Sequence, residues 1–440
     1  MQALSIAATR EDELASGFLA GAIKSSLRPL QALIAAPTLL FLTALTAMLF
    51  CHPDVPFHEL NRVTFALLVV GVVGRALILK QEVLRLERAT WPMIALTALA
   101  LISLVGRTVG EDTWGLLAAK YLFPFALFHL AKMIFTDDRS VQRFEAFALI
   151  VLAYLSFTAI VFLIGAHALV FPKFILDASL GYHAERARGP FLQPVPNGVS
   201  LNMLALLVLH GYRRGSLRST KTVVLLGAVP IAILATMTRA VWLSFVGSLL
   251  ALLFLSRNLR MRLAFIAVLV VAVVALGVVM SATQLGGVLG DRLEERAPVE
   301  FREAVYAGGW QMFLEHPLLG WGFHQMPAEL PKYVSEFHDK VMYPHNTYLE
   351  ILVENGLLGL SLYAWLMWEL WRLGRGKISA GESHGLLDSE FRRWWPILLA
   401  VYLVNAAVVV MSYQFVNGIL FSVAGIVAAQ RQRGEVSLAC

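Results

Sequence analysis

Residues 343–350 carry the side chains best suited to chemistry, and they lie immediately before a membrane-length apolar run. His345 is matched to proton transfer near neutral pH, although a lone histidine at a membrane interface is more often structural, in a turn that Pro344 sets before the helix. Asn346 is a residue type that caps helices. Glu350 falls in the first turn of the expected helix, where it either orients His345 or complements the positive end of the helix dipole. We therefore treat His345 as a candidate base, with Asn346, Tyr348 and Glu350 as supporting residues.

Arginine residues gather in the polar segments that flank this stretch. They are Arg186, Arg188, Arg239, Arg292, Arg296 and Arg302. A guanidinium group presents planar paired donors that suit phosphate oxygens, and it keeps its charge at any relevant pH. The set therefore indicates an anionic ligand close to His345. The alternative partners are lipid headgroups and the local carboxylates of Glu185, Glu295 and Glu303.

The composition is that of an all-α polytopic membrane protein. The chain has 440 residues, of which 58% are hydrophobic, and its mean hydropathy is +0.69. Apolar runs of about twenty residues recur along it, and each can cross about 30 Å of hydrocarbon. The net charge of +6 needs no nucleic-acid partner, because cationic cytoplasmic loops give the same balance.

We predict about twelve transmembrane helices. The predicted spans cover residues 29–50, 63–79, 91–106, 115–135, 144–171, 198–212, 223–237, 240–255, 263–284, 347–371, 396–412 and 414–430. With the N-terminus inside, Lys and Arg are about twice as frequent in the inner connections as in the outer ones. Both termini are therefore expected in the cytoplasm, and residues 1–440 are expected to form a single transmembrane domain.

That orientation leaves two sizeable polar segments on the outer side. The first covers about residues 172–197, and the second covers about residues 285–346 and includes His345. Within the second, residues 300–315 mix apolar and charged positions, as expected of a helix at the membrane surface that Gly308 and Gly309 weaken or kink. We expect the larger loop to carry part of the active site.

Several other kinds of site are missing from the sequence. It has no GxxxxGK[ST] phosphate loop, no GxSxG elbow and no Cys/His metal pattern. The outer segments also lack an Asp-x-Asp pair that would hold a divalent cation on a pyrophosphate, so we expect no metal and no cofactor. Lys120 is an in-span cation that cannot easily reach an interface, and intramembrane charge is costly and often functional.

A set of short motifs follows one another along the chain. The set comprises Arg188-Gly189-Pro190-Phe191, Pro196-Asn197-Gly198, Thr238-Arg239-Ala240, Arg302 with His316-Pro317-Leu318-Leu319-Gly320-Trp321-Gly322, Pro344-His345-Asn346-Thr347-Tyr348-Leu349 and Glu354-Asn355-Gly356-Leu357-Leu358-Gly359. In order and placement these motifs resemble the O-antigen ligase and polymerase family over about residues 180–360. One departure is Tyr306, because the family often has Trp four residues after the loop arginine.

The resemblance implies a GT-C-like glycosyltransferase of the bacterial inner membrane, active on the periplasmic face in lipopolysaccharide biosynthesis. Its donor would be an undecaprenyl-pyrophosphate-linked glycan, and its acceptor would be lipid A-core, with membrane lipids around the protein. His345, Arg239 and Arg302 would be catalytic, and these two arginines would bind the pyrophosphate together with Arg186 and Arg188. We favour a ligase. A polymerase that uses the same donor and a transporter or flippase of lipid-linked sugars are the open alternatives.

Overall fold

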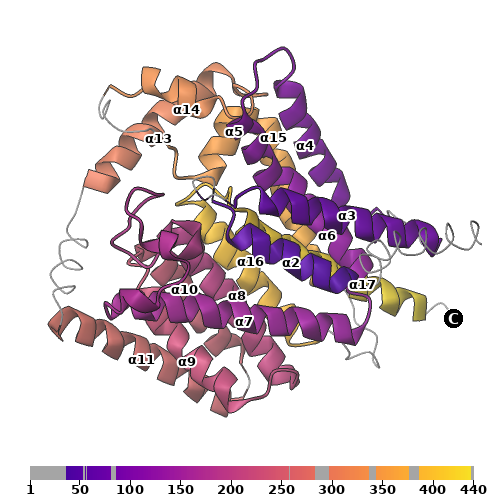
Figure 1. Ribbon diagram of the computed structural model, residues 1–440. Helices are drawn as coiled ribbons and strands as arrows, with labels where there is room; N and C mark the ends of the chain where they lie inside the picture. The colour runs from indigo at the N-terminus through magenta and orange to yellow at the C-terminus, as the bar shows by residue number, and fades with distance from the viewer. Residues whose placement is uncertain are drawn as a thin grey trace, which may run out of the picture.

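The computed structural model describes residues 36–52, 55, 57–80, 86–256, 258–282, 297–335, 343–375 and 386–437. Within these ranges the chain is helical and contains no strand (Figure 1), which confirms the all-α prediction. The α-helices are α2 (Pro37–Leu49), α3 (Leu60–Ile78), α4 (Thr90–Ser103), α5 (Glu111–Leu117), α6 (Phe123–Ile134), α7 (Asp138–Leu163), α8 (Pro194–Arg214), α9 (Thr220–Leu234), α10 (Arg239–Leu255), α11 (Leu259–Ala282), α13 (Ala297–Glu315), α14 (Met326–Glu329), α15 (Thr347–Leu373), α16 (Phe391–Ala406) and α17 (Gln414–Ser437). The shorter turns are η1 (Ala118–Leu122), η2 (His167–Leu169), η3 (Lys173–Leu176), η4 (Gly189–Phe191) and η5 (Leu330–Lys332).

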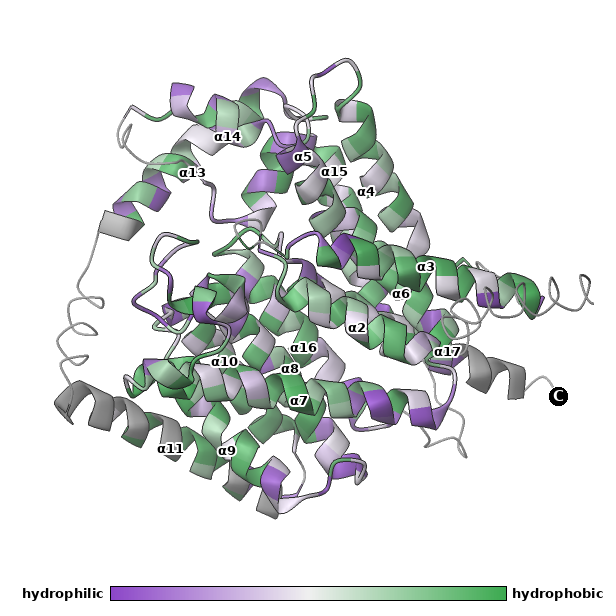
Figure 2. Ribbon diagram, in the orientation of Figure 1, coloured by the Kyte–Doolittle hydropathy of each residue, from purple (hydrophilic) through white to green (hydrophobic). Residues whose placement is uncertain are grey.

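Each predicted span overlaps a helix, and four helical segments of the described chain are long and apolar enough to cross a membrane. They are Leu60–Ile78, Glu111–Ile134, Asp138–Leu163 and Thr347–Leu373. Shorter apolar helices are Pro37–Leu49, Thr90–Ser103, Thr220–Leu234 and Arg239–Leu255. Figure 2 shows hydrophobic residues along α2, α4 and α7, and hydrophilic ones on α5 and α13. The chain is therefore a membrane protein, while the twelve spans and the GT-C-like arrangement stay predictions.

The sequence predicted a helix over residues 300–315 and a kink in it at Gly308 and Gly309, and the structure contains only the first of these. The predicted helix is present as α13, but the expected kink is wrong, because α13 is continuous through both glycines. A side chain at Gly308 would meet Val334 at 2.8 Å, and one at Gly309 would meet Met326 at 3.0 Å. These glycines allow close packing of α13 on its neighbours, and α13 also packs against α15.

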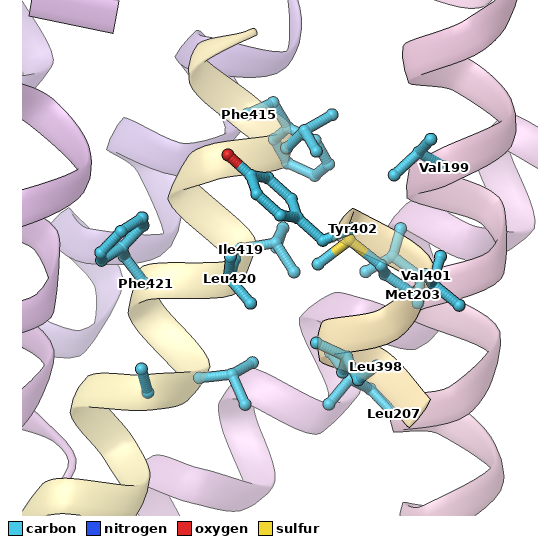
Figure 3. Close-up of a cluster of buried hydrophobic side chains, with 14 of the residues drawn as sticks. Val199, Met203, Leu207, Leu398, Val401, Tyr402, Phe415, Ile419, Leu420 and Phe421 are labelled. Atoms are coloured by element: carbon cyan, nitrogen blue, oxygen red, sulfur yellow. The ribbon is translucent and has the colours of Figure 1, made fainter. Parts of the chain in front are cut away.

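A cluster of buried hydrophobic side chains is formed by α8, α16 and α17 (Figure 3). Tyr402 is a polar member of this apolar cluster, and its hydroxyl donates to Asn417 Oδ1 at 2.8 Å. The Asn417 amide in turn donates to the carbonyl of Ala119 at 3.1 Å. The hydrogen bonds therefore connect the core to η1.

The turn η1 is a π-helical turn that separates α5 from α6. The N–H of Phe123 donates to Ala118 O, five residues back, instead of to Ala119 O. The next residue is Pro124, which has no N–H, so the carbonyl of Ala119 has no donor within its own helix. Asn417 supplies that donor. A hydrogen bond from α17 therefore stabilises the irregular turn that carries Lys120.

The long helix α15 is interrupted at Gly356, whose φ of 62° and ψ of −163° are not helical. The loop at residues 317–322 replaces the lost helical hydrogen bonds. Trp321 N–H and Gly322 N–H donate to the carbonyls of residues 353 and 354 at 2.9 and 2.8 Å, while the N–H groups of residues 357 and 358 donate to those of residues 317 and 318 at 2.8 and 3.2 Å. We call this pairing the loop–helix junction. It explains why two of the quoted motifs occur together, since non-helical backbone inside a membrane protein must find partners within the protein.

Candidate functional site

His345 lies directly in front of α15. Asn346 caps the helix, because its side-chain oxygen accepts from the N–H groups of Tyr348 and Leu349 at 2.9 and 3.1 Å. His345 itself has a left-handed backbone with φ of 45°. Thr347 ties this end to the α16–α17 connection by donating to Val409 O at 2.8 Å. The local sequence therefore places His345 at a capped and anchored helix start.

The surroundings of His345 keep its imidazole neutral. Its ring lies edge-to-face with Phe301 at a centroid distance of 6.4 Å. Burial, followed by the positive charges of Arg302 and of His183, lowers the pKa of His345 to about 4. At neutral pH one ring nitrogen is therefore an acceptor, and the neighbouring guanidinium of Arg302 can attract an anion to the same place.

Arg302 and Arg239 have no ion-pair partner among the described residues. Arg302 is half-buried near the start of α13, within electrostatic range of His345. Arg239 is exposed as the first residue of α10. The structure thus brings Arg302 into electrostatic range of His345, whereas the start of α10, where Arg239 lies, is packed against the segment described next. The predicted ligands Arg292 and Arg296 lie outside the described residues.

Three of the motifs form one packed unit around the 172–197 segment. The N–H of Ala187 donates to Ala235 O at 3.1 Å, just before α10. The amide of Asn197 donates to Ala187 O at 2.8 Å. Gly198 lies against Val241 with no room for a side chain. These contacts hold the segment that contains Arg186 and Arg188 against the start of α10.

Arg188 has a different environment from the other arginines. Its side chain is fully buried, at 0% exposure. Its Nε donates to Ile175 O at 2.9 Å, and its two terminal nitrogens donate to the carbonyls of Leu180 and Asp177. The guanidinium therefore fastens the loop of residues 175–188. Contact between Arg188 and a pyrophosphate would require this loop to rearrange.

Arg186 and His183 extend the cationic surface from the same loop. Arg186 lies 3.3 Å from the carboxylate of Glu185, and His183 lies 3.4 Å from it. The charge of His183 acts on His345, so this loop reaches the front of α15. Sequence reasoning did not single out His183, because only the tertiary fold brings it close to the site.

Glu350 has a partner that neither of its two predicted roles included. Its carboxylate lies 2.5 Å from Lys120 Nζ, and the two side chains are 3% and 8% exposed. Tyr348 has a structural contact, because its hydroxyl donates to Leu403 O at 2.7 Å. Within the described ranges, no three His, Cys, Asp or Glu side chains converge as a metal site would require.

Comparison with known proteins agrees with the motifs. Residues 222–364 match the family model described as O-Antigen ligase. The matched range contains Arg239, Arg302, His345 and the loop–helix junction, but it does not reach Arg186 or Arg188. No curated protein matches the chain significantly. The predicted resemblance to the O-antigen ligase family is confirmed over residues 222–364, the part of the chain that the family model matches.

Proposed function

We propose that this protein is an O-antigen ligase that transfers a glycan from undecaprenyl pyrophosphate to lipid A-core during lipopolysaccharide assembly. In this proposal it lies in the bacterial inner membrane with both termini in the cytoplasm, and His345 faces the periplasm. The family match supports the ligase chemistry, and the apolar helices support the membrane location.

The observation that carries the proposal is a neutral imidazole beside an arginine without a described carboxylate partner. His345 is kept uncharged by burial and by Arg302. A proton acceptor next to a cation is suited to a reaction in which a hydroxyl loses its proton while a phosphorylated group leaves. A bound pyrophosphate would raise the pKa of His345 toward the range in which general bases work best.

The transfer would be a single displacement. An acceptor hydroxyl attacks the anomeric carbon of the donor, the new carbon–oxygen bond forms as the bond to the pyrophosphate oxygen breaks, and the hydroxyl proton passes to His345. The anomeric centre is inverted. Arg302, Arg239 and Arg186 stabilise the charge on the leaving pyrophosphate, where one well-placed donor contributes roughly 10²- to 10³-fold. Neither a metal nor a nucleotide is needed for this step.

The test uses purified protein in vesicles with an undecaprenyl-pyrophosphate glycan, lipid A-core, EDTA and no ATP. We expect lipid A-core to receive the glycan. His345→Ala should lower kcat by about 10²- to 10⁴-fold, the usual contribution of a general base. Lys332→Met is the matched control, because Lys332 is exposed and pairs with Glu329 on the surface.

Other products would point to the alternatives. Transfer to a second lipid-linked glycan instead of lipid A-core would identify a polymerase. Movement of the donor across the membrane without a new glycosidic bond would identify a transporter. A His345→Ala variant that transfers at the wild-type rate would remove His345 as the base.

A further inference from the structure

The leading segment of α15, residues 347–355, is a short unit that carries His345 at its front end. Because Gly356 leaves helical geometry, continuous helical hydrogen bonds do not join this segment to the rest of α15. Its orientation depends on contacts with other elements. The loop–helix junction holds its far end, and Thr347 holds its front end to the α16–α17 connection through Val409 and Met411.

Lys120 contacts the leading segment at Glu350, at a position between its two ends. Its ammonium pairs with Glu350 at 2.5 Å and lies 5.4 Å from the ring centroid of Phe323. Phe323 follows the junction loop and is itself held by α4, because its N–H donates to the side-chain oxygen of Ser103 at 2.9 Å. Lys120 therefore links the leading segment to the loop that completes α15.

A second acidic side chain, that of Glu354, lies near the same cation. Glu354 lies one helical turn after Glu350, is 1% exposed, and interacts electrostatically with both Glu350 and Lys120. Backbone N–H groups of His324 and Met326 hydrogen-bond to its carboxylate. Without Lys120, two acidic side chains of the leading segment would face each other in a buried place, which is unfavourable.

Lys120 is in turn held firmly by its own helix. It lies in the π-helical turn η1, where the amide of Asn417 from the core donates to the buried carbonyl of Ala119. Such turns recur at functional positions in helices. The fold therefore holds the backbone of Lys120 in place, so its ion pair with Glu350 can orient the leading segment.

We propose that Lys120 is a positioning residue for glycan transfer: its buried ion pair with Glu350 sets the leading segment of α15, and with it His345, relative to Arg302. This inference rests on the proposed function. Loss of the pair lets the segment shift, and a displacement of about 1 Å at a reacting group costs on the order of 100-fold in rate.

The test compares Lys120→Met with Lys132→Met in the vesicle assay. Lys132 is a matched control, because it lies about 18 Å further along the same helical segment and its own buried side chain forms an ion pair with the partly buried Glu87 at 2.9 Å. We expect Lys120→Met to lower kcat by about 10- to 100-fold with the donor KM within about threefold of wild type. Lys132→Met should keep the wild-type kcat even if its melting temperature falls by as much as that of Lys120→Met.

A double variant with exchanged charges provides a second test if a single variant does not fold. The double variant Lys120→Glu with Glu350→Lys retains the ion pair, and we expect it to recover most of the lost kcat. A folded double variant with no recovery would overturn the inference. So would equal kcat values for Lys120→Met and Lys132→Met, or a rise in donor KM with unchanged kcat, which would make Lys120 a donor ligand. Wild-type transfer in the same vesicles tests the proposed function separately.

Discussion

Arg188 and Arg302 have the same side chain and were predicted to bind the same pyrophosphate, yet the structure surrounds them differently. Arg188 is fully buried and donates to the carbonyls of Ile175, Leu180 and Asp177. Arg302 is half-buried, has no described carboxylate partner and acts on His345. The hydrogen-bond partners of an arginine therefore show whether its guanidinium holds a loop or is available to a ligand. The residue type alone does not show this.

The largest effect is expected for Arg188→Met, on stability. Its removal leaves three buried carbonyls without donors, so the free energy of unfolding should fall by about 3–5 kcal/mol. Unfolding in detergent measures this loss. Arg188→Lys should recover little, because one ammonium cannot replace three separate guanidinium nitrogens. A folded Arg188→Met protein with wild-type stability and weaker donor binding would instead make Arg188 a ligand.

The next effect is expected for Arg302→Lys, on activity. Paired contacts to phosphate are lost although the charge stays, so kcat should fall by roughly 10- to 1000-fold. The free energy of unfolding should change by no more than about 0.5 kcal/mol, as for other residues without buried partners. Transfer assays and unfolding curves on the same preparation separate the two quantities. A large loss of stability in Arg302→Lys would show that Arg302, like Arg188, has a structural role.

The smallest effect is a shift in the pH profile. The acid limb of kcat/KM reports the free enzyme, so for the wild type it should lie near 4, the pKa of His345. Arg302→Met removes a positive neighbour, which raises the pKa of His345 and moves the limb up by up to about one unit. Arg239→Met should lower activity and leave the limb in place. Equal limbs in Arg302→Met and wild type would show that Arg302 does not act on His345.

Local patterns predicted more of the fold than of the site. The cap at Asn346 follows from residue type, and the helices follow from apolar runs, because both depend on neighbours in the sequence. The predicted span at 144–171 lies too far along the chain, since α7 runs from Asp138 to Leu163 and a loop with η2 follows. The kink expected at Gly308 and Gly309 was wrong, because those glycines serve close packing with other elements.

The sequence by itself determined that this is a helical membrane protein, the order of its family motifs and the position of His345 at a helix start. The tertiary structure decided the partners: Glu350 for Lys120, three carbonyls for Arg188, and Arg302 and His183 for His345. Hydropathy and capping are local properties of the chain. Ion pairing, burial and the pKa of His345 depend on residues far apart in the sequence, which only the folded chain brings together.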